Sequence, residues 1–194
     1  MRLSRASHNL DTVEKGEVDM ISNILVATDG SETAGRAVEL AADLAARLGV
    51  PITVGHVLQH GARVDELSRM AEIEHLVRHV KVELQPHLND IPTNMDALFS
   101  GSLSGADRER IVAVIGEEIA ARAARSAKDA GAKNVSTRVV NGDYDEGILS
   151  MAKEAGADTI VIGHRGLGRV QRIFQGSVSQ KVNQQADCTV VTVR

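Results

Sequence analysis

The segment GHRGLGRVQRIFQGS combines glycines with a hydroxyl residue in a pattern that suits anion binding. Gly163, Gly166 and Gly176 would let the backbone approach a ligand closely and adopt positive φ angles, which leaves N–H groups pointing into a concave nest. Ser177 follows at the expected start of a helix, where free N–H groups favour phosphate and the hydroxyl could donate to a phosphate oxygen. A turn followed by a capping box that starts at Ser177 explains the same residues without a ligand. Composition alone leaves the two interpretations open.

The established phosphate fingerprints do not occur in this sequence. It contains no G-x-x-x-x-G-K-[ST] loop, and the turn after the first expected strand reads TDGSET where a dinucleotide site needs G-x-G-x-x-G. Nicotinamide and flavin dinucleotides are therefore disfavoured as ligands. Arg165, between the first two glycines, is a further candidate contact, whereas we interpret Arg169 and Arg172 as solvated surface.

The elements that would position this segment alternate between strands and helices. Apolar runs predict strands, a 3.6-residue period predicts helices, and the glycine segment follows the fourth strand. The expected strands lie in 21–30, 51–58, 134–142, 158–163 and 188–194, and the expected helices lie in 31–49, 65–84, 107–131, 143–156 and from 177 onward. This order predicts a flavodoxin-like or Rossmann-like α/β fold, a five-stranded parallel sheet in the order 3-2-1-4-5 with helices on both faces. Ser31 and Asp107 are expected to cap the first and third of these helices, and Gly49 to end the first.

Composition limits the classes of function. The formal net charge is -4, and the three aromatic residues offer no stacking surface, so we expect no nucleic-acid partner. No apolar run approaches the length of a membrane span, so we expect no insertion into a membrane. Cys188 is the only cysteine, so the chain forms no internal disulfide, which favours the cytoplasm. We expect residues 1–20 to be a disordered extension and residues 21–194 a single domain with a helical insertion at about 61–108.

At this point the sequence resembles the universal stress protein family. Nucleotide-binding members carry G-x2-G-x9-G-[ST] after the fourth strand, and the spacing of Gly163, Gly166, Gly176 and Ser177 matches it. The resemblance also covers NILVATDGS, ITVGHV, VVNGD, ADTIVIGHRG and GSVSQKVNQQADCTVVTVR, in the family's order. It departs at His164, where such members usually have a small polar residue.

The resemblance implies an ATP site. Gly163, Gly166, Gly176, Ser177 and the Val178 amide would hold the triphosphate, with Mg²⁺ or Mn²⁺ held mainly by the phosphates. Asp29 would lie at the nucleoside end, because a carboxylate repels a triphosphate unless a metal intervenes; an Asp before Gly also suits a plain turn. The remaining positions that the resemblance assigns to the adenosine are Ala27, Val57, Gly142 and Ile162.

The resemblance further implies a homodimer in which the edge strand at 188–194 pairs with its symmetry mate. We expect no dedicated catalytic residue and no protein metal site, because no base is positioned for an attacking water, although slow ATP hydrolysis or autophosphorylation would be compatible with the site. The function that follows is a stress-response protein whose nucleotide occupancy modulates dimerisation or binding of an unidentified protein partner. The alternative is an interaction module that acts through the insertion at 61–108 without nucleotide.

Overall fold

The computed structural model describes residues 21–58, 105–166 and 177–194. The expected N-terminal extension, the expected helix at 65–84 and most of the expected insertion at 61–108 lie outside these ranges, as does Gly176. The described part of the chain contains a sheet, four helices and the turn that follows the fourth strand.

A five-stranded parallel sheet in the order β3-β2-β1-β4-β5 forms the centre of the molecule, as predicted. Its strands are β1 (Ile24–Ala27), β2 (Ile52–Leu58), β3 (Val135–Asn141), β4 (Thr159–Gly163) and β5 (Thr189–Val193). The inner strands β2, β1 and β4 are buried along their whole length, because helices cover both of their faces. Their continuous apolar sequences follow from this double burial.

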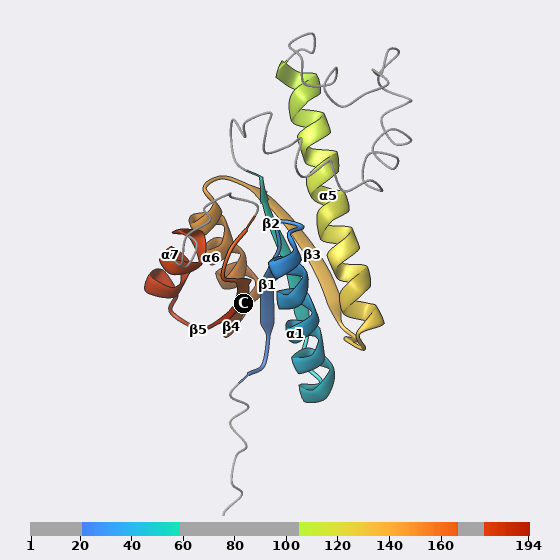
Figure 1. The fold of residues 1–194 in the computed structure, drawn as a ribbon, viewed down its shortest axis with the longest axis vertical. Coiled ribbons are helices and arrows are strands. Elements are labelled where there is room, and N and C mark those ends of the chain that lie inside the picture. Colours follow the sequence, from blue (N-terminus) through green and yellow to red (C-terminus); the bar gives the residue numbers. More distant parts are fainter. Residues whose placement is uncertain (1–20, 59–104, 167–176) are drawn as a thin grey trace, which may run out of the picture.

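Two helices cover each face of the sheet (Figure 1). α1 (Glu32–Leu48) and α5 (Gly105–Asp129) lie on one face, and α6 (Tyr144–Ala155) and α7 (Ser177–Gln185) lie on the other. The N-terminal part of α5 extends beyond the carboxyl edge of the sheet (Figure 1). This edge is where parallel α/β sheets bind their ligands.

Local signals set both ends of α1, as predicted. Ser31 Oγ accepts a hydrogen bond from Ala34 N at 3.2 Å, and Gly49 ends the helix in the left-handed region with a φ of 72°. The prediction for α5 is wrong at its start, because the helix begins at Gly105 and already includes Asp107. Asp is favoured both at the N-cap and in the first turn of helices, so the sequence alone does not distinguish the two positions.

Alternation of side chains along the strands divides the core into two layers. One layer, under α1 and α5, contains Val26, Val54 and Val161. The other layer, under α6 and α7, contains the strand residues Leu25, Ala27, Val57, Ile160 and Ile162. All three residues predicted to flank adenine therefore lie on the α6/α7 side of the sheet.

His56 is buried in the α1/α5 layer, with 2% of its surface exposed. Its Nδ1 lies 2.8 Å from Thr28 O, and because a carbonyl oxygen only accepts, Nδ1 carries the proton. Nε2 is buried without a hydrogen-bond partner among the described residues. Burial lowers the pKa of His56, although the bond to Thr28 and the charge of Asp29 oppose this effect.

The lowered pKa of His56 predicts an acid-sensitive fold. Below about pH 6.5 the unfolded state binds a proton that the folded state excludes, so the free energy of unfolding should fall as pH decreases, by at most about 1.4 kcal/mol per pH unit for this group. Urea unfolding of the wild-type protein and of His56→Gln between pH 8 and pH 5 measures this loss. The variant should show a smaller slope against pH; parallel curves for the two proteins would contradict the prediction.

Candidate functional site

An apolar floor, formed by Ala27, Val57 and Ile162, lies at the carboxyl edge of the three inner strands. Ala27 pairs in register with Ile162 on one side and Gly55 on the other, and Val57 lies two residues beyond Gly55. The three floor residues are 7%, 5% and 6% exposed, whereas Leu25, deeper in the same layer, is fully buried. The structure thus brings together three predicted residues that are far apart in the sequence.

Asp29 follows β1, and the turn into α1 holds its carboxylate. Asp29 Oδ1 accepts a hydrogen bond from Ser31 N at 3.0 Å, and Thr28 Oγ1 accepts one from Gly30 N at 3.2 Å. The first bond is that of an Asx turn and the second that of an ST turn, so the structural interpretation of Asp29 applies whatever else it binds. They also fix a negative charge at the carboxyl edge of the sheet.

Gly166 leaves room for this carboxylate. A Cβ added at Gly166 would lie 2.3 Å from Asp29 Oδ2, far inside van der Waals contact. The β4 turn and the β1 turn therefore meet at Asp29 and Gly166. Any larger residue at position 166 would displace the Asp29 side chain.

Gly163 leaves room for α1. A Cβ there would lie 3.1 Å from Thr33 C and 3.2 Å from both Ala34 N and Arg165 O. Neither Gly163 nor Gly166 has a positive φ, so the expectation that these two glycines supply left-handed backbone is wrong. Close approach of β4 to the first turn of α1, and of the β4 turn to Asp29, explains them instead.

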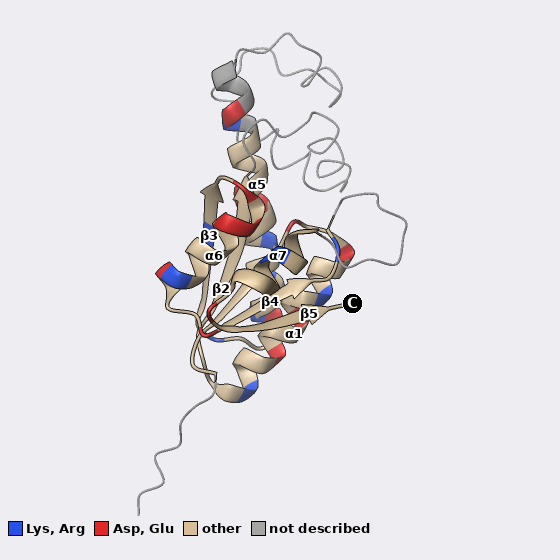
Figure 2. Cartoon of the chain, turned by 90° about the vertical axis from the view of Figure 1, so that its left-hand side faces the viewer, with Lys and Arg blue, Asp and Glu red and all other residues tan. Residues whose placement is uncertain are grey.

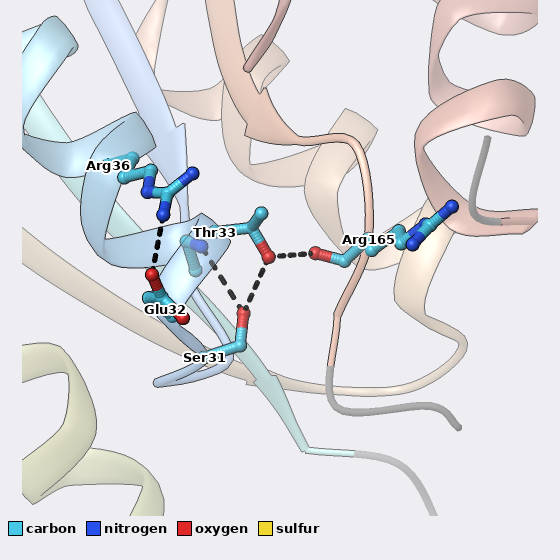
Figure 3. Close-up of polar contacts among 6 residues, drawn as sticks. Ser31, Glu32, Thr33, Arg36 and Arg165 are labelled. Carbon is cyan, nitrogen blue, oxygen red and sulfur yellow. Dashed lines mark hydrogen bonds and ion pairs between the residues drawn. The ribbon is translucent and has the colours of Figure 1, made fainter. Parts of the chain in front are cut away.

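Two hydroxyl groups hold the main chain of the β4 turn. Thr33 Oγ1 in α1 donates a hydrogen bond to Arg165 O at 2.8 Å (Figure 3). Ser179 Oγ in α7 donates one to His164 O at 3.1 Å. No hydrogen bond from the main-chain N–H of Arg165 or Gly166 is found within the described ranges. Sequence reasoning missed Thr33 and Ser179, because a hydroxyl residue in the first turn of a helix is too common to be a signal.

His164 ties the same turn to the edge strand β5. Its main-chain N–H and its Nδ1 both lie within hydrogen-bond distance of Val193 O, at 2.7 Å and 3.2 Å. The side chain of Arg165 is exposed and extends away from Thr33 (Figure 3). The departure from the family pattern at position 164 thus adds a second bond between the β4 turn and the last residue of β5.

The start of α6 is acidic. Asp143 is its N-cap residue, and Asp145 and Glu146 lie in its first turn, which is the red turn beside β3 in Figure 2. Asp145 Oδ1 lies 3.2 Å from Lys181 Nζ in α7, an ion pair whose carboxylate is largely buried. Gly142, the predicted neighbour of the ribose, donates its N–H to Leu58 O at 3.0 Å and so lies at the end of β2.

The start of α7 carries no acidic residue in its first turn. Ser177 and Val178 are the first two residues of this helix, so their N–H groups have no partner in a preceding turn of the same helix. Ser177 is exposed and Val178 is half-buried. Of the two helix starts on this face, that of α7 is thus the one suited to an external anion.

A separate cavity of about 350 Å³ opens between α1 and α5. It is lined by Thr28, Gly30 and Ser31 of the β1 turn, Gly35, Val38 and Glu39 of α1, and Ile119, Arg122, Ala123 and Ser126 of α5. The apolar floor lies on the opposite face of the sheet, so this cavity and the predicted site are different places that meet only at the β1 turn. None of the predicted site residues lines the cavity.

The remaining metal-ligating and nucleophilic side chains in the described ranges form no metal site or reactive centre. No group of three or more His, Cys, Asp or Glu side chains there could hold a metal ion. The Cys188 thiol is half-buried, and burial together with the charges of Asp158 and Asp187 raises its pKa, which agrees with a structural cysteine. Within the described ranges, the helices are too short or too polar to cross a bilayer.

A parallel sheet of this order, with a glycine turn after β4 and an apolar floor at its carboxyl edge, defines an α/β domain of the kind that binds ligands at the ends of its inner strands. The model of the universal stress protein family matches residues 20–194, and the chain belongs to that family, as the motif spacing indicated.

Curated relatives agree with this assignment over nearly the whole chain. Universal stress protein YxiE of Bacillus subtilis is 28% identical over 175 residues and covers 90% of this chain and 100% of its own length. Stress response protein NhaX of the same organism is 28% identical and covers 88% of this chain and 96% of its own length.

Solved structures share the fold at lower identity. Universal stress protein UspA from Lactobacillus plantarum has a TM-score of 0.62 at 21% identity, covering 89% of this chain and 97% of its own. A universal stress protein in complex with cAMP has a TM-score of 0.54 at 21% identity, covering 90% and 97%. The Archaeoglobus fulgidus protein in complex with dAMP has a TM-score of 0.55 at 22% identity, covering 89% and 98%.

Proposed function

We propose that this protein binds an adenine nucleotide, with ATP as the expected ligand, at the carboxyl edge of β2, β1 and β4. The observation that carries the proposal is the juxtaposition of the apolar floor with the N–H group of Gly166, for which the described ranges show no acceptor. A nucleotide needs an apolar surface for its base and donors for its phosphates, and the two lie at one edge here. The complexes of related folds with cAMP and dAMP support the same ligand class.

The charge distribution orients this nucleotide. The acidic start of α6 and Gly142 lie at the β2 side, where an uncharged adenosine is the better neighbour. The β4 turn and the start of α7 supply main-chain donors and no acidic residue in the first helical turn, which suits the phosphates. Asp29 lies between the acidic start of α6 and the start of α7, against Gly166. Its carboxylate would therefore face the ribose or a divalent cation bound to the phosphates, because it would repel uncompensated phosphate oxygens.

Residues of this chain would therefore have the following roles in the complex. Ala27, Val57 and Ile162 contact the base, and the N–H groups of Gly166, Ser177 and Val178 hold phosphate together with the motif glycines Gly163 and Gly176. The exposed Arg165 side chain is a mobile positive charge for the outer phosphate. Mg²⁺ or Mn²⁺ would neutralise the triphosphate and is held mainly by it. No residue is assigned a catalytic role.

Nucleotide occupancy would modulate assembly through β5. This strand lies at the edge of the sheet, and its half-buried apolar residues suit pairing with a second copy of the chain. His164 joins the β4 turn to Val193 at the end of β5. A nucleotide that orders the β4 turn would therefore also change the position or mobility of the proposed dimer edge. The contact of His164 with Val193 would link the proposed ligand site to the surface through which the protein would dimerise.

Calorimetric titration of the purified protein with ATP and MgCl₂, AMP, cAMP, adenosine and GTP tests this function. We expect adenine nucleotides to bind, GTP to bind at least about tenfold more weakly, and the dimer fraction in native mass spectrometry to change with ATP. Absence of binding by every nucleotide would overturn the proposal. It would favour the alternative interaction module at 61–108, most of which lies outside the described residues.

A further inference from the structure

The main chain of the β4 turn is held on two sides by side-chain hydroxyls. Thr33 in the first turn of α1 holds the carbonyl of Arg165, and Ser179 in α7 holds the carbonyl of His164. The two carbonyls belong to successive peptide groups, and their partners belong to helices on opposite faces of the sheet. Each of these peptide groups therefore has a defined orientation before any ligand arrives.

The orientation of each carbonyl determines that of the next N–H. A trans peptide is planar and its C=O and N–H point in opposite directions, and the described ranges contain no cis peptide. Because the His164 carbonyl points toward Ser179, the N–H of Arg165 points away from α7. Because the Arg165 carbonyl points toward Thr33, the N–H of Gly166 points away from α1. Both of these N–H groups are among those without a hydrogen bond in the described ranges.

We propose that Thr33 and Ser179 are positioning residues for the nucleotide phosphates: Thr33 holds the Arg165 carbonyl toward α1 and so turns the Gly166 amide toward the α7 side as a preformed phosphate donor, and Ser179 fixes the preceding peptide group so that the turn keeps this orientation. This role rests on the proposed function. Donors that are already oriented stabilise an anion without the cost of reorganising the backbone on binding. Loss of either hydroxyl frees one peptide group to rotate, and the bound anion must then order it.

The two residues differ in burial, and this predicts which is more important. Ser179 is 2% exposed, so in Ser179→Ala the His164 carbonyl loses its partner where water reaches it poorly. Thr33 is half-buried, and water can replace its hydroxyl in Thr33→Val. We expect a loss of ATP affinity of about threefold for Thr33→Val and about tenfold for Ser179→Ala, which correspond to the lower and upper range of a single hydrogen bond.

Comparison of ATP with adenosine separates positioning from general damage. Both variants should bind adenosine as the wild-type protein does, because adenosine makes no phosphate contact. Thr33→Ser, which keeps the hydroxyl and adds no atom, should restore ATP affinity. In NMR spectra of the nucleotide-free protein, the Arg165 and Gly166 amide resonances should be broadened in Thr33→Val and Ser179→Ala.

Matched controls are Thr53→Val, which loses a hydroxyl bond to Ser136 at the opposite end of β2, and Ser150→Ala on the exposed side of α6.

The outcomes are distinguishable. Wild-type ATP affinity in both Thr33→Val and Ser179→Ala, or an equal loss of ATP and adenosine affinity, would overturn the positioning role while leaving nucleotide binding intact. Failure of the wild-type protein to bind ATP would overturn the proposed function and this role with it. A selective loss of ATP affinity in Thr33→Val and Ser179→Ala, with wild-type affinity in Thr33→Ser, supports both.

Discussion

Gly166→Ala should lower ATP affinity by about tenfold to a hundredfold. The new Cβ would lie 2.3 Å from Asp29 Oδ2, so the carboxylate must rotate away and give up the bond that Asp29 Oδ1 accepts from Ser31 N. Moving the turn instead would disturb the Gly166 amide that we assign to phosphate. Either response would move a group that we assign to the nucleotide, the Asp29 carboxylate or the Gly166 amide, and losing one such contact costs about 1 to 3 kcal/mol of binding free energy. Calorimetric titration with ATP and MgCl₂ measures the effect.

A double-mutant cycle with Asp29→Ala identifies the cause. When the carboxylate is absent, Gly166→Ala has nothing to displace, so the second substitution should cost less than about threefold in the Asp29→Ala background. The free energy of unfolding should show the same non-additivity. Additive effects of the two substitutions on both quantities would mean that Asp29 is not what keeps position 166 a glycine.

Gly163→Ala should destabilise the fold by about 1 to 3 kcal/mol, the cost of inserting a methyl group into a closely packed site. Its Cβ would lie 3.1 to 3.2 Å from main-chain atoms of Thr33, Ala34 and Arg165. Main-chain atoms in a helix and in a held turn cannot move aside as the end of a flexible side chain can. Urea unfolding at neutral pH measures the loss.

Gly35→Ala is the matched control for that substitution. Gly35 lies in α1, and a Cβ there would meet nothing within 4 Å. Removing a glycine from a helix interior should stabilise the protein by about 0.5 to 1 kcal/mol. The two Gly→Ala changes should therefore shift the unfolding midpoint in opposite directions. A Gly163→Ala variant as stable as the wild-type protein would show that β4 and α1 are not packed as closely as the structure has them.

Glycine is therefore required at positions 163 and 166, the two motif positions that the structure describes, for different physical reasons. Gly163 permits close packing of β4 on α1, and Gly166 accommodates a carboxylate from the neighbouring turn. Both reasons concern contacts within the protein, and phosphate would bind the amides that this packing leaves exposed. The spacing of the glycines predicted the position of the candidate site. The predicted reason for glycine at these positions, a positive φ, was wrong, because close packing and not left-handed backbone requires glycine there.

Much of the fold could be predicted because it depends on local patterns. The apolar runs gave the inner strands, Ser31 and Gly49 gave the ends of α1, and the alternation of elements gave the sheet order, each through interactions within a few residues or through general rules of topology. The start of α5 at Gly105 could not be predicted, because Asp is as common in the first turn of a helix as at its N-cap.

The sequence by itself determined the family, the parallel sheet and the residues at the carboxyl ends of β1, β2 and β4, since these follow from periodicity and motif spacing. Only the tertiary structure decided that Asp29 lies against Gly166 and that Thr33 and Ser179 hold the carbonyls of the β4 turn. Such contacts join residues that no periodicity relates. They exist because packing α1 and α7 on opposite faces of one sheet brings the first turns of both helices to the same loop.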